Sequence, residues 1–100
     1  MHEYCLSLVC KPAIEESLLD LLREVDDVET FTSFSIRHYG AEAARLSAEE
    51  QVLGRSRSIH LQLLLDEPTM TRLLGRIGKS LGGTGIRYWA TPVAFEGEIK

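Results

Sequence analysis

The chain has 100 residues, of which 44% are hydrophobic and 26% charged, and its formal net charge is −4. This length fits one globular domain spanning residues 1–100, with a modest core, and excludes a second domain. The mildly acidic, scattered charge excludes the basic surface that nucleic-acid binding needs. Apolar runs are short, so we expect no direct membrane insertion, no export signal and a cytoplasmic location.

Residues 3–25 predict a strand followed by a helix. Apolar residues alternate along the strand at Tyr4, Leu6, Leu8 and Cys10. After Pro12, an apolar stripe at helical spacing comprises Ile14, Leu18, Leu21, Leu22 and Val25. Cys5 and Cys10 stand five residues apart in this strand and therefore point to opposite faces, which excludes a disulfide between them.

Residues 58–81 repeat this design. Ile59, Leu61, Leu63 and Leu65 alternate with Ser58, His60, Gln62 and Leu64, which predicts a strand with one face in a core. Pro68 suits a first helical turn, and the stripe that follows comprises Met70, Leu73, Leu74, Ile77 and Leu81. Superposing Pro12 on Pro68 aligns the two stripes, so we interpret the chain as an internal repeat.

Between the two units, residues 30–37 predict a second strand, and residues 38–57 predict a connection of roughly twenty residues. Within it, Ser47-Ala48-Glu49-Glu50 matches a capping box, which predicts a short helix over residues 48–53 closed by Gly54. The glycine-rich turn at residues 82–85 is followed by a fourth strand over residues 86–93. Pro92 cannot donate to a ladder, so this strand is predicted to lie at a sheet edge.

The predicted order is strand, helix, strand, strand, helix, strand, which indicates the α+β, ferredoxin-like arrangement with two helices on one face of an antiparallel sheet. The other face is then open. We expect it to present Cys5, Ser7, Val9, Ser33, Ser35, Arg37, Ser58, His60, Gln62, Leu64, Arg87, Trp89, Thr91 and Val93. Such a mixture of apolar and polar side chains is typical of subunit interfaces, so other copies of the chain are expected to cover it.

Three stretches, residues 46–55, 83–89 and 91–93, resemble the PII signalling superfamily, and most closely a small uncharacterised PII-like group. The resemblance implies a homotrimer with sheets facing inward. It also implies a genetic association with heavy-metal efflux pumps of the resistance–nodulation–division type, and no enzymatic activity.

By the same resemblance, residues 38–57 correspond to the loop through which PII proteins contact a transporter or enzyme. The implied ligand-binding residues are Gly40, Arg45, Gly83, Gly85 and Arg87, and the implied partner contacts are Glu42, Arg45, Glu49 and Glu50. The chain departs from the PII pattern, because Ile86 stands where PII proteins have lysine and the C-terminal arginine pair is absent. The usual mode of ATP binding is therefore not implied, although glycine N–H groups near an arginine still suit an anion.

Several residues admit two interpretations. Gly82, Gly83 and Gly85 are either a helix stop or part of a phosphate-binding site. Cys5 and His60, on neighbouring strands of the open face, are either packed interface residues or, with further copies brought close in a trimer, soft ligands for zinc or copper. The metal interpretation corresponds to a protein that resembles the copper-tolerance trimers of similar fold. Trp89 suits an interface anchor or a stacking platform for a ligand, whereas Tyr88 is expected in the core.

The function predicted from the sequence is a PII-like regulator that responds to a small ligand, with nucleotide or Zn/Cu as candidates, by contacting an efflux system. The first alternative is a metal-tolerance protein, and the second is a small enzyme with an intersubunit site. No known catalytic motif is present, so the enzyme class is the least favoured.

Overall fold

The computed structural model describes residues 2–39 and 55–100. Its strands are β1 (Tyr4–Cys10), β2 (Thr32–Tyr39), β3 (Arg55–Leu65) and β4 (Arg87–Pro92). Its helices are α1 (Glu15–Glu24), preceded by the 3₁₀ turn η1 (Pro12–Ile14), and α3 (Glu67–Leu81). This order confirms the predicted ferredoxin-like α+β fold.

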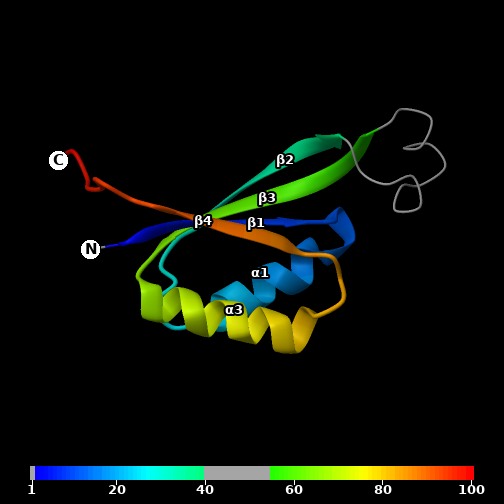
Figure 1. The fold of residues 1–100 in the computed structure, drawn as a ribbon, viewed down its shortest axis with the longest axis horizontal. Coiled ribbons are helices and arrows are strands. Elements are labelled where there is room, and N and C mark those ends of the chain that lie inside the picture. Colours follow the sequence, from blue (N-terminus) through cyan, green and yellow to red (C-terminus); the bar gives the residue numbers. More distant parts are fainter. Residues whose placement is uncertain (1, 40–54) are drawn as a thin grey trace.

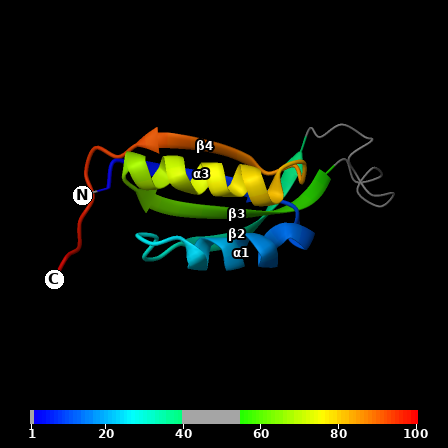
Figure 2. The ribbon, with the colours of Figure 1, turned by 90° about the horizontal axis from the view of Figure 1, so that it is seen from below.

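The strands form one antiparallel sheet in the order β2-β3-β1-β4. Both helices lie against the same face of the sheet, and the other face is uncovered (Figures 1 and 2). As predicted from Pro92, β4 is an edge strand. In the described part of the chain, neither helix is long and apolar enough to span a bilayer.

The core lies between the helices and the two central strands, β1 and β3, each of which has a neighbouring strand on both sides. Leu6, Leu8 and Leu61 are completely buried there. The helix layer of the core comes from the predicted apolar stripes. These are Leu18, Leu21 and Leu22 of α1 with Val25 just after it, and Leu73 and Ile77 of α3. Alternation in the strands and helical spacing in the helices thus place the same leucine-rich residues in one cluster.

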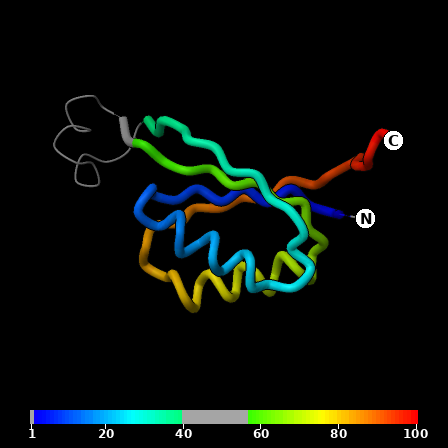
Figure 3. Tube along the Cα trace, turned by 180° about the vertical axis from the view of Figure 1, so that it is seen from behind, coloured from blue at the N-terminus to red at the C-terminus, as the bar shows by residue number. Residues whose placement is uncertain are grey.

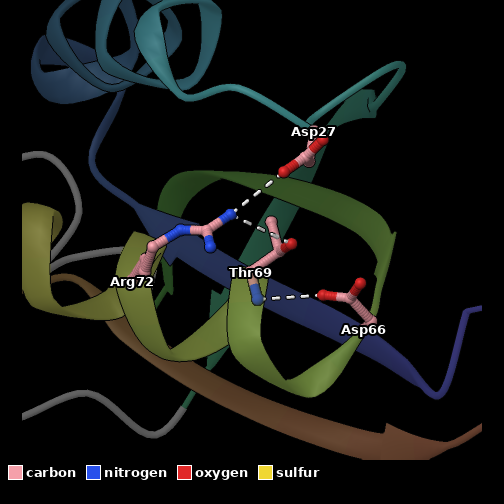
Figure 4. Close-up of polar contacts among 4 residues, drawn as sticks. All are labelled: Asp27, Asp66, Thr69 and Arg72. Atoms are coloured by element: carbon pink, nitrogen blue, oxygen red, sulfur yellow. Dashed lines mark hydrogen bonds and ion pairs between the residues drawn. The ribbon is translucent and has the colours of Figure 1, made fainter.

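Helix α3 begins with a side-chain cap (Figure 4). Asp66 Oδ1 accepts a hydrogen bond from the backbone N–H of Thr69 at 2.9 Å. Hydrogen bonds from Thr69 hold the pKa of Asp66 below its ordinary value. Arg72, one turn further, forms an ion pair with Asp27 at 3.1 Å, which ties α3 to the segment after α1.

The hairpin of β2 and β3 is longer than predicted. His38 pairs with Ser56 and Tyr39 with Arg55, so the strands take residues 38–39 and 55–57 from the predicted connection 38–57. Residues 40–54, including the predicted helix 48–53, lie outside the described residues. Toward its tip the hairpin rises away from the helix layer, while both chain termini lie at the opposite end of the molecule (Figures 1 and 3).

The predicted orientation of the second strand is wrong. Ser33 and Ser35 pair with Leu61 and Ile59, whose side chains enter the core, so the two serines lie on the helix side. Phe34, opposite His60, lies on the open face instead. Because β2 is an edge strand whose hairpin rises away from the helices, its helix side need not be apolar, and its apolar residues alternate onto the other face.

The predicted burial of Tyr88 in the core is also wrong. Tyr88 pairs with Leu8 and therefore lies on the helix side, as expected, but it is 59% exposed rather than in the core. Edge strand β4 carries it beyond the part of the sheet that the helices cover.

Candidate functional site

The open face of the sheet is the most distinctive surface of the molecule. We define it by the strand residues whose side chains lie opposite the helices: Cys5, Ser7, Val9, Thr32, Phe34, Ile36, His38, Ser58, His60, Gln62, Leu64, Arg87, Trp89 and Thr91. Phe34, Leu64 and Trp89 are 43%, 42% and 45% exposed. Arg87 is the only Lys, Arg, Asp or Glu among these residues, although 26% of the chain is charged. Large apolar side chains and depleted charge are typical of the centre of a protein interface.

Three rings meet at the middle of this face. Phe34 stacks on His60 with centroids 4.6 Å apart, because the two residues are directly opposite in register. Trp89 contacts the other side of His60 edge-on at 5.4 Å. It reaches across β1, and beneath it Ser7 and Val9 are only 4% and 7% exposed although they belong to the open face. We call Phe34, His60 and Trp89 the aromatic cluster.

The aromatic cluster contains one unsatisfied polar atom. Nε2 of His60 is buried and has no hydrogen-bond partner among the described residues. A buried polar group without a partner costs about 1–3 kcal/mol, so such atoms are rare in folded chains and call for an explanation.

The predicted metal ligands Cys5 and His60 do lie on neighbouring strands and on the same face. Cys5, however, pairs with Leu64, which is four residues along β3 from His60. That separation is about 13 Å along the strand, so one chain does not bring both side chains to a single ion. The described residues contain no group of three or more His, Cys, Asp or Glu side chains arranged to hold a metal.

The two cysteines are free and have different surroundings. Cys5 is half-buried on the open face, and Cys10 is buried in the core. Burial, with a smaller contribution from Glu15, raises the pKa of the Cys10 thiol. Cys10 therefore stays protonated and unreactive, as the sequence predicts for a packed thiol.

A second feature lies toward the tip of the β2–β3 hairpin, next to the connection 40–54, and we call the cavity there the hairpin-base cavity because it lies at the base of that connection. Arg37 and Arg57 are directly opposite each other and both project to the helix side. They line a cavity of about 780 Å³ together with Pro12, Ser35, Ile36, Tyr39, Ser58 and Ile59. Arg37 and Arg57 thus bring two cationic side chains to the wall of this cavity.

The glycine-rich turn is explained by the end of α3. A Cβ atom on Gly82 would lie 2.6 Å from the carbonyl oxygen of Gly78, and Gly83 and Gly85 have φ of 83° and 84°. Thr84 closes the turn by donating from its hydroxyl to the Leu81 carbonyl at 2.6 Å. These observations support the helix stop, and they leave a phosphate-binding role for Gly83, Gly85 and Arg87 as a prediction.

The turn and the hairpin base lie at the same end of the molecule. Arg87, just after the turn, pairs with Val9 near the end of β1, and Cys10 pairs with Ile59, which lines the hairpin-base cavity. Figure 1 shows the end of α3, η1 and the tip of the hairpin together at this end. Arg87 itself points to the open face, away from the side on which Arg37 and Arg57 lie.

A third feature, at the opposite end, involves both termini. His2 donates its backbone N–H to Glu96 Oε1 at 3.2 Å, and its Nδ1 lies 3.1 Å from the same oxygen. The backbone hydrogen bond from His2 holds the pKa of Glu96 below its ordinary value, and the nearby charge of His2 adds to the effect. The two residues border a groove of about 630 Å³ that also includes Cys5, Glu29 and Glu98.

The remaining predicted site residues cannot be placed. Gly40, Glu42, Arg45, Glu49 and Glu50 all lie outside the described residues. Prediction from the sequence missed Phe34, because the alternation of Phe34 and Ile36 with serines assigned the apolar residues to the core side, and only the register with β3 shows otherwise. It also missed the facing of Arg37 and Arg57, because Arg57 was assigned to the long connection rather than to a strand.

Comparison with known families decides the classification. The family described as "Protein of unknown function (DUF3240)" matches residues 1–100. The chain belongs to this family. No curated protein sequence matches it.

Solved structures with this fold include a member of the DUF3240 family from Shewanella baltica OS155. It has a TM-score of 0.81 at 18% identity, with 100% of this chain and 99% of that chain covered. CPII from Thiomonas intermedia K12, a nitrogen regulatory PII-like protein bound to ADP, AMP and bicarbonate, has a TM-score of 0.73 at 15% identity, with 99% and 98% covered. A putative PII-like signalling protein from Thermus thermophilus has a TM-score of 0.66 at 16% identity, with 91% and 86% covered. The DUF3240 chain therefore has the PII-like fold that its sequence predicts.

Proposed function

We propose that this DUF3240 chain is a PII-like regulatory binding protein that works as a homotrimer. In this proposal the open sheet faces are turned inward, and a small anionic ligand binds at the hairpin base. The ligand controls how the segment around residues 40–54 contacts a partner. The sequence resemblance suggests a heavy-metal efflux system as that partner, and the protein acts by binding rather than by catalysis.

The observation that carries the ligand proposal is the facing of Arg37 and Arg57 at the hairpin-base cavity. Two arginines at paired strand positions suit a phosphate or carboxylate, which guanidinium groups bind through charge-assisted hydrogen bonds. The cavity volume of about 780 Å³ is in the range of small-molecule sites. The fold neighbour CPII, which was solved with ADP, AMP and bicarbonate, suggests which anions to test first.

The trimer proposal rests on the open face. Four strands spaced about 4.8 Å apart and about seven residues long give a face of about 440 Å², within the about 300–600 Å² of the largest apolar patch on a typical monomer, which is often functional. Arg87 is the only Lys, Arg, Asp or Glu residue on this face, so contact with an identical face involves little charge repulsion, although the whole chain carries a net charge of −4.

Calorimetric titration tests the ligand. ADP, AMP, ATP, bicarbonate, Zn²⁺ and Cu⁺ are titrated separately into the wild-type protein and into Arg37→Gln, Arg57→Gln and the matched control Arg23→Gln. Arg23 is exposed on α1, where it pairs with Asp20. Loss of one charge-assisted contact is expected to weaken anion binding roughly 10- to 100-fold in the first two variants, with the control unchanged.

The same titrations separate the alternatives. Heat with the metal ions alone supports the metal-tolerance alternative, and its loss on replacing Cys5 or His60 identifies the ligands. Flat traces for every compound overturn the proposed ligand-controlled function. Equal weakening in Arg23→Gln shows that net charge, rather than the hairpin-base cavity, accounts for binding.

A further inference from the structure

The unsatisfied nitrogen of His60 points to a change in the aromatic cluster when copies of the chain associate. In the isolated chain, Phe34 and Trp89 close over His60, and Nε2 is buried without a partner among the described residues. The rings nevertheless remain 43% and 45% exposed. The isolated chain therefore encloses a polar nitrogen and leaves large apolar ring surfaces in water, which is the reverse of the energetically favourable arrangement.

This arrangement has a physical cause in the isolated chain. Folding Trp89 across β1 onto His60 removes part of the indole from water at about 25 cal/mol per Å², and this gain offsets the cost of the enclosed nitrogen. A second copy seated on the open face would cover the same indole surface. Once the partner covers Trp89, contact with His60 is no longer needed to remove the indole from water. The free-energy cost of the enclosed nitrogen then has nothing to offset it.

Trp89 is the ring placed to move. Phe34 is stacked on His60 at 4.6 Å with an interplanar angle of 30°, whereas Trp89 meets it edge-on at 5.4 Å and 69°. No group of a partner can reach Nε2 while the nitrogen is enclosed, so a ring has to turn first.

We propose that the aromatic cluster is a latch for self-association: when a second copy docks on the open face, Trp89 moves off His60, and Nε2 forms a hydrogen bond with a polar group of that copy. The occupant is another copy of the chain because the face is nearly uncharged, so an identical face meets it with little charge repulsion. Its polar residues, such as Thr32 and Thr91, supply hydrogen-bonding groups from the partner's own open face. The inference rests on the proposed homo-oligomer and adds to it a residue whose hydrogen bonding is completed only by the partner.

Trp89 is the only tryptophan of the chain, so its fluorescence reports on the latch directly. Emission and molecular mass are measured together across a wide concentration range. Imidazole quenches indole emission on contact, so we expect the wild-type emission to brighten as the mass rises. His60→Phe keeps an aromatic ring between Phe34 and Trp89 but lacks Nε2. It is expected to weaken association roughly tenfold or more, because a group of the partner is left unpaired.

Gln62→Leu is the matched control, since it removes an exposed polar group from the same strand and the same face. Association of Gln62→Leu is expected to change less than that of His60→Phe. A second measurement, long-range ¹H–¹⁵N NMR of the wild-type imidazole, needs no variant. It is expected to show Nε2 hydrogen-bonded in the assembly and unbonded in the dilute chain.

The outcomes are distinct. A wild-type chain that is monomeric at every concentration overturns the proposed trimer and the latch together. A wild-type assembly that His60→Phe matches in affinity, or whose Trp89 emission stays constant as the mass rises, overturns the latch alone and leaves the proposed function standing.

Discussion

Replacing Trp89 by serine tests whether the open face is an interface. An indole side chain has a surface of about 250 Å², and the 45% that is exposed in the single chain amounts to about 110 Å². Burying this area against another copy at about 25 cal/mol per Å² contributes about 3 kcal/mol per subunit. Trp89→Ser should therefore lower the association constant by about a factor of 100 at each interface.

The neighbouring Tyr88 is a stringent control. It is 59% exposed, more than Trp89, but it lies on the helix side of the same edge strand. If apolar exposure alone drove association, Tyr88→Ser would weaken it at least as much. If the open face is the interface, only Trp89→Ser should have a large effect.

The assay is sedimentation velocity of the three proteins over a wide concentration range, with thermal unfolding followed by circular dichroism to show that each variant is folded. We expect the wild type and Tyr88→Ser to remain assembled at concentrations where Trp89→Ser is monomeric. Equal weakening by both variants, or a wild type that stays monomeric at micromolar concentration, would refute the reasoning.

Three further predictions concern the stability of the fold. Leu73 is completely buried between α3 and the sheet, so Leu73→Ala should lower the free energy of unfolding by about 2–5 kcal/mol in urea titrations, and a smaller loss would show that the core relaxes around the cavity. Asp66→Ala removes the cap on Thr69 and should lower Tm by roughly 3–8 °C at neutral pH. The folded pKa of Asp66 lies below its ordinary value of 3.8, so the stabilisation by Asp66 is complete above pH 3.8 and is lost as the pH falls through the folded pKa. The difference in Tm between wild type and Asp66→Ala should therefore disappear in strong acid. A difference in Tm that is independent of pH would contradict the role of Asp66 as a cap. Gly82→Ala places a Cβ atom 2.6 Å from the carbonyl oxygen of Gly78, so it should lower Tm, whereas Gly75→Ala, in the same helix with open space around it, should not.

The periodicity of apolar residues was sufficient to predict the strands and helices of the fold. The alternation at Leu6 and Leu8 and the helical stripe around Leu73 predicted both strand–helix units, since each pattern has only one geometry that puts all its apolar members on one side. Turn chemistry was equally informative: Pro68 and the glycines after α3 predicted where that helix begins and ends, and Asp66, which the sequence placed in the turn before it, proved to be its cap.

Residue patterns failed where one strand lies at the margin of the core. The second strand carries apolar residues on the face opposite to that of its neighbours, and only its register with β3 shows this. The same register was needed to place Arg37 opposite Arg57, and to separate Cys5 from His60 by four residues of strand. Pairing between strands brings together residues that are far apart in the chain, and one sequence carries no signal for which of them meet.

The sequence by itself therefore determined the order of elements, the composition of the core and the existence of an open sheet face, because burial of apolar side chains leaves a local periodic record. Only the tertiary structure decided which side of β2 contributes to that face, and which of its residues touch one another. The stacking of Phe34 on His60, the reach of Trp89 across β1 and the enclosed nitrogen between them arise from cross-strand distances, and these distances are set by register and twist rather than by any local pattern.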